Sequence, residues 1–176
     1  MDNVLVIQMA RMGDFIQSTP LLCGIKKANP GCTLHMLVDK NILDFAGTCP
    51  FVDQRYGLDT QLLTSAVSRR DNAKTVYGLV REQCRELHEL AVDAVYNLNY
   101  SPITALLSSI PHADYVLGYG ISENRNRLSR TPWFAFFNTM IRHMPLAPFN
   151  LVDFFYYLGG LPEHRPQQPC YRPTRE

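Results

Sequence analysis

The sequence predicts an α/β fold, in which a parallel sheet is flanked by helices. Three observations favour this class. Val4 to Met9 is an almost continuous apolar run rich in β-branched residues, which is typical of a strand buried on both faces. Apolar residues at helical spacing follow it, and a second apolar run covers Thr33 to Val38. Strand and helix patterns then alternate along most of the chain.

The first unit of this alternation places a turn where ligands usually bind. Apolar residues recur at helical spacing between Phe15 and Ile25, and Asn29-Pro30-Gly31 ends that helix. A strand, a helix and a second strand form the right-handed crossover of α/β sheets. The turn at residues 11–14 therefore lies at the carboxyl end of the first strand, where open sheets bind their ligands.

Later segments continue the same pattern with shorter elements. The apolar spacing predicts helices over Ile42–Ala46, Val76–Ala91 and Ile103–Ser109, and strands over Val52–Tyr56, Ala94–Leu98 and Tyr115–Gly118. Residues 121–130 are polar and predict a loop, and the aromatic stretch 133–141 predicts a short helix. We expect a last helix over Leu151–Leu158, closed by Gly159-Gly160 as a left-handed cap. A domain over residues 1–160 is expected, followed by a proline-rich linker over 161–176.

Composition narrows the function classes. With 46% hydrophobic and 19% charged residues among 176, the chain should bury a packed core. A formal charge of +1 argues against a global attraction to nucleic acid, so any cationic function must be local. The five cysteines show no C-x-x-C spacing, which argues against disulfides and zinc and favours a cytoplasmic location. Neither a signal peptide nor a transmembrane helix is expected.

The turn Arg11-Met12-Gly13-Asp14 is the most informative stretch. A dinucleotide-binding loop needs three glycines so that the backbone can approach the pyrophosphate, but here only Gly13 is present. Two interpretations of Asp14 stay open. The carboxylate caps the following helix by accepting hydrogen bonds from main-chain N–H groups, or it points into the ligand cleft and acts as a general base.

The same stretch resembles a known family. Val4 to Pro20, with Met12-Gly13-Asp14 followed by Thr19-Pro20-Leu21, is similar to the opening of glycosyltransferase family 9, the ADP-heptose:lipopolysaccharide heptosyltransferases. Looser similarity extends to segments later in the chain, namely Lys26–Gly31, His35–Val38, Asp93–Leu98, Val116–Tyr119 and Leu151–Gly159. Only the opening motif is specific.

The resemblance implies a GT-B architecture, in which two Rossmann-like domains face each other across a cleft. The first domain holds mainly the acceptor, and the second holds mainly the nucleotide-sugar donor, such as ADP-heptose. This sequence ends where the second domain would begin, so the resemblance implies an N-terminal half that is inactive without its C-terminal donor domain. The aspartate that matches Asp14 is the catalytic base in this family, and the acceptor is a lipopolysaccharide core or a related anionic glycan.

An inverting transfer needs a base for the acceptor hydroxyl and stabilisation of the departing diphosphate. Asp14 would meet the first need, and the absent domain would meet the second. No Asp-x-Asp pair occurs, so we predict metal independence and no cofactor. The candidates for acceptor binding are Arg11, Met12, Gly13, Asn99, Arg125 and Arg127. A solvated arginine on the surface is the alternative interpretation of Arg11, Arg125 and Arg127. Lys40, Asn41 and Asn99 also follow strands, although a loop role explains each of these three equally well.

The aromatic cluster Trp133–Phe137 also has two interpretations. Core packing is favoured, and the alternative is a surface patch that makes peripheral contact with the inner membrane. Two functions stay open for the chain. It is the acceptor domain of a heptosyltransferase-like enzyme, or it is a non-catalytic Rossmann-like module that binds an anionic sugar or a partner chain. A cleft left open by an absent domain also predicts self-association.

Overall fold

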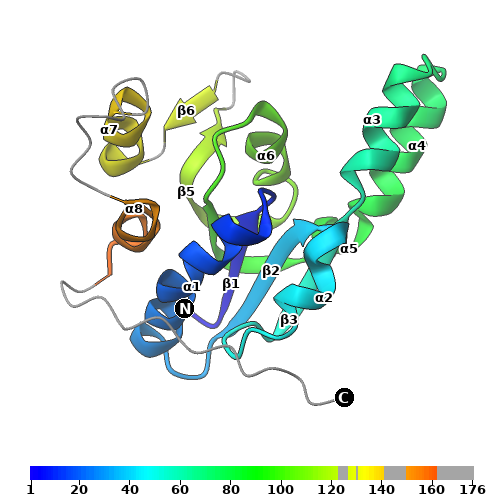
Figure 1. Ribbon diagram of the computed structural model, residues 1–176. Helices are drawn as coiled ribbons and strands as arrows, with labels where there is room; N and C mark the ends of the chain where they lie inside the picture. Colours follow the sequence, from blue (N-terminus) through cyan, green and yellow to red (C-terminus); the bar gives the residue numbers. More distant parts are fainter. Residues whose placement is uncertain (123–126, 130, 141–149, 162–176) are drawn as a thin grey trace.

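A six-stranded sheet forms the centre of the molecule (Figure 1). A computed structural model describes residues 1–122, 127–129, 131–140 and 150–161. The strand order is β3-β2-β1-β4-β5-β6, in which β6 alone runs antiparallel to its neighbour. The strands are β1 Asn3–Gln8, β2 Thr33–Asp39, β3 Gln54–Leu58, β4 Ala91–Asn97, β5 His112–Ile121 and β6 Arg127–Ser129. The predicted Rossmann-like α/β fold with a parallel sheet is confirmed.

Helices cover both faces of this sheet. They are α1 Met12–Ala28, the 3₁₀ turn η1 Lys40–Ile42, α2 Leu43–Ala46, α3 Thr60–Ser68, α4 Ala73–Gln83, α5 Arg85–Glu89, α6 Pro102–Leu107, α7 Pro132–Met140 and α8 Leu151–Leu158. Helices α1, α2, α7 and α8 pack on one face, and α5 and Leu107 of α6 pack on the other. Strand β1 is buried between the layers: Val4 and Val6 face the first layer, and Leu5 and Ile7 face the second. This two-sided burial explains the continuous apolar run.

Helix α1 carries a proline in its interior, and a side-chain hydroxyl replaces the main-chain hydrogen bond that this proline cannot make. Pro20 has no N–H group to donate to the Ile16 carbonyl, which is four residues earlier. The Thr19 hydroxyl donates to that same carbonyl at 2.6 Å, and the Ser18 hydroxyl donates to the Phe15 carbonyl at 2.7 Å. The Ser-Thr-Pro sequence of the opening motif therefore satisfies the backbone groups of the helix that positions the first turn.

Several predicted boundaries are wrong, and pairing or packing explains the differences. The single helix predicted over 76–91 is divided at Cys84, where the backbone leaves helical geometry (φ −96°, ψ 4°). Helix α3 was not predicted, and β3 begins two residues later than expected because its limits follow its pairing with β2. Strand β6 lies inside the predicted loop 121–130, where it pairs with β5.

Helix α8 and the glycines that follow it come near the end of the residues that the structure describes. Helix α8 has the predicted limits, but Gly159 is helical and only Gly160 takes the left-handed conformation, at φ +60°. Residues 162–176, which make up almost all of the predicted linker, lie outside the described residues, as does Arg125. The division into a domain and a linker stays a prediction.

The aromatic cluster packs into the core, as the favoured interpretation expects. The Trp133 indole N–H donates to the Phe154 carbonyl at 3.0 Å, and Phe134 is buried against Phe154. The cluster is therefore engaged with α8, although Phe136 remains exposed at its rim. Within the described residues, no helix combines the length and the apolar character that crossing a membrane requires.

A buried histidine in β2 makes stability depend on pH. His35 is 7% exposed, its Nδ1 lies 3.1 Å from the Tyr56 hydroxyl, and its Nε2 has no hydrogen-bond partner among the described residues. Burial lowers the pKa of His35 below its usual value, and the nearby Asp53 carboxylate opposes this shift only partly. The folded state therefore binds this proton less readily than the unfolded state does.

We expect the free energy of unfolding to fall as the pH drops below about 6.5, the usual pKa of histidine, with a slope of at most about 1.4 kcal/mol per pH unit from this group. Above that pH the free energy of unfolding is not lowered by His35, because this side chain is neutral in both the folded and the unfolded state. Urea denaturation between pH 7.5 and 5 measures how the free energy of unfolding changes with pH. The ordinary pKa of histidine, unlike that of the other side chains, lies in this range. His35→Gln should flatten the slope, and the exposed His112→Gln should not; equal slopes in both variants would contradict this assignment.

Candidate active site at the carboxyl edge of the sheet

Asp14 lies in the first turn of α1, directly after β1. Its Oδ2 accepts the Arg11 N–H at 3.2 Å, and its own N–H donates to the Arg11 carbonyl at 3.0 Å. This is one half of a capping box, since an arginine side chain at the N-cap has no acceptor to complete the other half. The capping interpretation of Asp14 is therefore part of the structure.

Capping nevertheless leaves part of the carboxylate available. Asp14 is half-buried, and its Oδ1 makes no hydrogen bond or ion pair with the residues that the structure describes. One oxygen is thus held by the backbone, and the other is open to accept a hydrogen bond or a proton. The two interpretations of Asp14 are compatible, because they use different oxygens.

The turn beside Asp14 presents open surface. Arg11 and Gly13 are exposed, and Met12 is 45% exposed. A Cβ atom built on Gly13 would meet nothing within 4 Å, and its backbone is helical, so the fold does not require glycine there. Glycine in a helix costs up to about 1 kcal/mol relative to alanine. The fold therefore does not explain the glycine at this position.

Three amide side chains tie this turn to the neighbouring strands. The Asn99 Oδ1 accepts the Met9 N–H at 2.7 Å, and its Nδ2 donates to the Gln8 Oε1, also at 2.7 Å. The Asn97 Oδ1 accepts the Asn99 N–H at 3.0 Å. The Asn97 Nδ2 donates to the Tyr119 carbonyl at 2.6 Å. This chain of bonds, which we call the amide network, joins the carboxyl ends of β1, β4 and β5.

The amide network changes the interpretation of Asn99. The sequence predicts it as a substrate-binding residue, but both ends of its side-chain amide bond within the protein, so its visible role is to position the turn that precedes Asp14. Gln8 and Asn97 are fully buried and were missed as parts of the site. The sequence feature that could have identified both residues is a polar residue at the end of an apolar strand, as in Val-Ile-Gln and Val-Tyr-Asn.

Asn99→Ala should lower the free energy of unfolding by about 1–3 kcal/mol, because it removes the acceptor of the Met9 N–H and leaves the Gln8 Oε1 only its long bond from the Ala10 N–H, at 3.4 Å. Asn99→Asp should cost less, since a carboxylate still accepts from Met9 and the Gln8 Nε2, which has no partner among the described residues, can turn to donate to it. Urea denaturation measures both. An alanine variant as stable as the aspartate variant would contradict the proposed role of the network.

An exposed aromatic ring stands beside the amide network. Tyr100 is 56% exposed, although its ring lies 4.5 Å from the ring of Tyr119 and 6.1 Å from that of Phe134, measured between centroids. Its position directly after Asn99 places it at the same edge of the sheet. An exposed aromatic ring that also contacts other rings is a suitable surface for stacking against the apolar face of a sugar.

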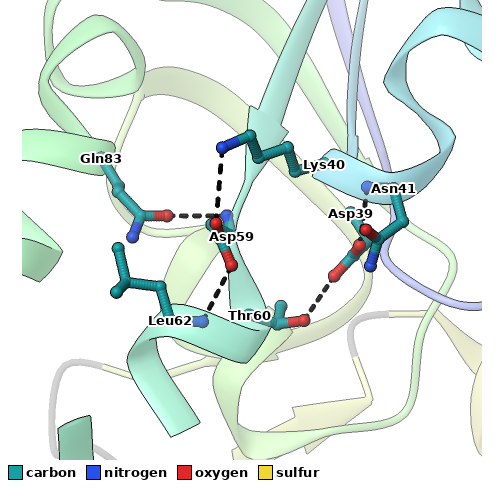
Figure 2. A network of polar contacts seen from close by, with 7 residues as sticks. All are labelled: Asp39, Lys40, Asn41, Asp59, Thr60, Leu62 and Gln83. Carbon is teal, nitrogen blue, oxygen red and sulfur yellow. Dashed lines mark hydrogen bonds and ion pairs between the residues drawn. The ribbon is translucent and has the colours of Figure 1, made fainter. Parts of the chain in front are cut away.

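A second polar network holds the ends of β2 and β3 (Figure 2). Asp39 accepts from the Thr60 hydroxyl and, at 2.9 Å, from the Asn41 N–H. Asp59 accepts the Leu62 N–H at 2.8 Å and lies 3.5 Å from the Lys40 ammonium. The Leu62 bond first, and then Lys40, hold the pKa of Asp59 below its usual range. Lys40 therefore helps to hold the start of α3 through Asp59, whereas the Asn41 N–H bond to Asp39 caps η1.

The structure brings some of the predicted residues together and leaves others apart or undescribed. Arg11, Met12, Gly13, Asp14 and Asn99 meet at the carboxyl edge of β1 and β4. Arg127 lies in β6, where its backbone pairs with Ile121, and its side chain is not among those described. Among the described residues, no three His, Cys, Asp or Glu side chains are grouped as metal ligands would be, and metal independence stays a prediction.

Cavities lined by described residues lie away from this edge. One of about 620 Å³ lies over β4 and β5 and includes Tyr96, Tyr115 and Leu117. Another of about 750 Å³ lies along α4 and α5. Neither of these two cavities includes a predicted site residue.

Comparisons with known proteins give a local sequence match to a glycosyltransferase and a fold shared with solved glycosyltransferases. No protein-family model matches the chain. A curated relative from Haemophilus influenzae, described as a putative glycosyltransferase, is 38% identical over 53 residues, which are 30% of this chain and 15% of that protein. This match is local.

Solved structures share the fold over nearly the whole chain. The Escherichia coli heptosyltransferase WaaC with ADP covers 94% of this chain at 17% identity and a TM-score of 0.65, and the match spans 49% of WaaC. WaaC with ADP-2-deoxy-2-fluoro heptose gives 16% identity and a TM-score of 0.67, again over 94% of this chain and 51% of WaaC. The glycosyl transferase family 9 protein of Veillonella parvula gives 18% identity and a TM-score of 0.62, over 93% of this chain and 43% of that protein.

This chain therefore spans about half the length of the structures it matches or less. The likeness bears out, at the level of fold, the resemblance that the opening motif indicated: the chain has the Rossmann-like fold found in about half of WaaC and of a family 9 glycosyltransferase.

Proposed function

We propose that this chain is the acceptor-binding domain of an inverting glycosyltransferase, with Asp14 as the general base. The reaction would move heptose or a similar sugar from a nucleotide-sugar to a lipopolysaccharide core or a related anionic glycan. The observation that carries the proposal is the position of Asp14, at the carboxyl edge of a heptosyltransferase-like fold, with one oxygen capping α1 and the other open.

The chemistry follows from that open oxygen. An acceptor hydroxyl that donates to Oδ1 of Asp14 would lose its proton as its oxygen attacks the anomeric carbon. The bond from that carbon to the diphosphate oxygen breaks, and the pair of electrons leaves with the nucleotide. The donor domain would stabilise this negative charge. The Asp14 carboxylate at the turn could not, because it would repel the diphosphate. No metal is assigned to either step.

Binding of the acceptor would use the surface around the turn. Gly13 would let a sugar ring approach the backbone, and Arg11 would supply a planar cation for a phosphate or carboxylate on the glycan. Tyr100 would stack on a sugar face. Asn99 would act by positioning the turn. Met12, Arg125 and Arg127 remain predicted contacts with the acceptor.

The donor is proposed from the comparisons and from the sequence resemblance. Two of the structures with this fold are described as WaaC with ADP and with a fluorinated ADP-heptose, which supports an ADP-linked sugar as the donor here. Its binding site would lie in a second domain. The reaction would take place in the cytoplasm at the inner membrane, where a lipid-linked acceptor is accessible.

A transfer assay tests the proposal. The chain would be mixed with a separately expressed nucleotide-sugar domain, ADP-heptose and a lipopolysaccharide-core acceptor, and the released ADP would be measured. Transfer that depends on Asp14 supports the proposal. Acceptor binding without any transfer, and unchanged by Asp14→Asn, would favour the non-catalytic binding module.

A further inference from the structure

Helices α3 and α4 form a hairpin that projects from the body of the molecule (Figure 1). Within it, α4 buries no side chain and α3 buries only Ala66. Four large apolar side chains are exposed instead: Leu62 at 40%, Val67 at 62%, Tyr77 at 67% and Val80 at 38%. Amphipathic helices normally bury such side chains, so the hairpin carries large apolar side chains that the described part of the chain leaves exposed.

Positive charge is concentrated at the tip of the hairpin. Arg69, Arg70 and Lys74 are all exposed there, and the one acidic residue, Asp71, pairs with Arg69 at 3.1 Å. Toward the base, α4 and α5 carry Glu82, Glu86 and Glu89 against Arg81 and Arg85. The tip thus has a local excess of cations in a chain whose formal charge is only +1.

One face of α4 continues this surface away from the tip. Lys74, Tyr77 and Arg81 are spaced by three and four residues, so they lie on the same side of the helix. Tyr77, Val80 and Arg81 also line the cavity of about 750 Å³, which Ile110 closes from another part of the chain. The same cavity is also lined by Glu82 and Glu89, so the excess of cations is confined to the part of the hairpin near its tip.

The tip holds an arginine in a conformation that favours glycine. Arg70 has a φ of +57°, and no other residue besides glycine has a positive φ in the described part of the chain. A left-handed residue costs free energy unless it is glycine or, to a lesser extent, asparagine. The turn would be more stable with glycine at position 70, so the fold does not explain the cation there.

We propose that the α3–α4 hairpin docks on an anionic membrane surface. Each Lys or Arg near anionic lipid adds to the attraction, and exposed Val67 and Tyr77 can enter the boundary between headgroups and acyl chains. The strength of such binding grows with the buried apolar area and with the attraction to anionic lipid, and the hairpin offers both. The exposed apolar side chains favour a lipid surface over nucleic acid, whose phosphates would contact cations alone. The Trp133–Phe137 cluster, by contrast, is packed against α8.

Vesicle sedimentation tests this proposal on the chain itself. We expect binding to vesicles of phosphatidylcholine mixed with phosphatidylglycerol, little binding to phosphatidylcholine alone, and weaker binding as salt increases. Arg70→Gly/Lys74→Ser should weaken binding about tenfold or more, and Arg70→Gly suits the left-handed turn, so the fold should be kept. Tyr77→Ser should weaken binding with little change in salt dependence.

A matched variant separates local from general charge. Lys27→Ser/Arg55→Ser removes two exposed cations outside the hairpin and should bind vesicles as the unchanged chain does. Equal loss in the two double variants would overturn the proposal, as would equal binding to both kinds of vesicle. Tighter binding to duplex DNA than to anionic vesicles would overturn it as well. None of these measurements depends on sugar transfer, so the proposed function and this docking surface can fail separately.

Discussion

Asp14→Asn is expected to lower kcat for sugar transfer by about 10²–10⁴-fold, the contribution typical of a positioned general base. The amide cannot take the acceptor proton, although its size and shape match those of the carboxylate. The rate of ADP release from ADP-heptose, measured with the nucleotide-sugar domain and acceptor present, gives kcat. Acceptor affinity should change much less than kcat, since the lost interaction matters mainly in the transition state.

The two roles of Asp14 can be separated because they use different oxygens. Asparagine keeps an oxygen that can accept the Arg11 N–H, so Asp14→Asn should retain most of the cap and nearly all of the stability. Asp14→Ala removes both roles and should also lower the free energy of unfolding by about 1 kcal/mol. If the asparagine variant is fully active while the alanine variant is merely less stable, Asp14 is only a helix cap.

Gly118→Ala is expected to destabilise the fold by about 3 kcal/mol or more. Gly118 has a φ of +89°, which disfavours any other residue, and an added Cβ would overlap the carbonyl oxygen of Asn97 on the paired strand β4. A backbone oxygen inside a sheet cannot move aside. The same change would disturb Tyr119, whose carbonyl accepts from Asn97 in the amide network. Urea denaturation or the level of folded protein measures the loss.

Gly13→Ala is the matched control for this prediction. Its Cβ meets nothing within 4 Å and its backbone is helical, so the variant should be as stable as the unchanged chain or more stable by up to about 1 kcal/mol. The two glycines would then have different roles: the backbone requires Gly118, whereas Gly13 leaves room above the turn. Equal destabilisation of both variants would contradict this distinction.

The elements that the sequence predicted well are those specified by local patterns. The apolar run of β1 and the limits of α8 come from short-range periodicity and end signals, which act within a few residues. Strand β6 was missed because it exists through its pairing with β5, whereas α3 was missed although Leu62, Leu63 and Ala66 recur in it at helical spacing. The division of the predicted 76–91 helix at Cys84 likewise depends on packing, since Leu87 turns into the core from α5.

The sequence by itself determined the α/β class, the turn that carries Asp14 at the end of β1, and the resemblance of its opening motif. These depend on residue order over short distances. Only the tertiary structure decided that Asp14 uses one oxygen for capping, that Asn99 bonds to Gln8 and Met9, and that the α3–α4 hairpin projects with its apolar side chains exposed. Each of these depends on groups brought together from separate segments or on the folded geometry of a side chain, which periodicity along the chain does not encode.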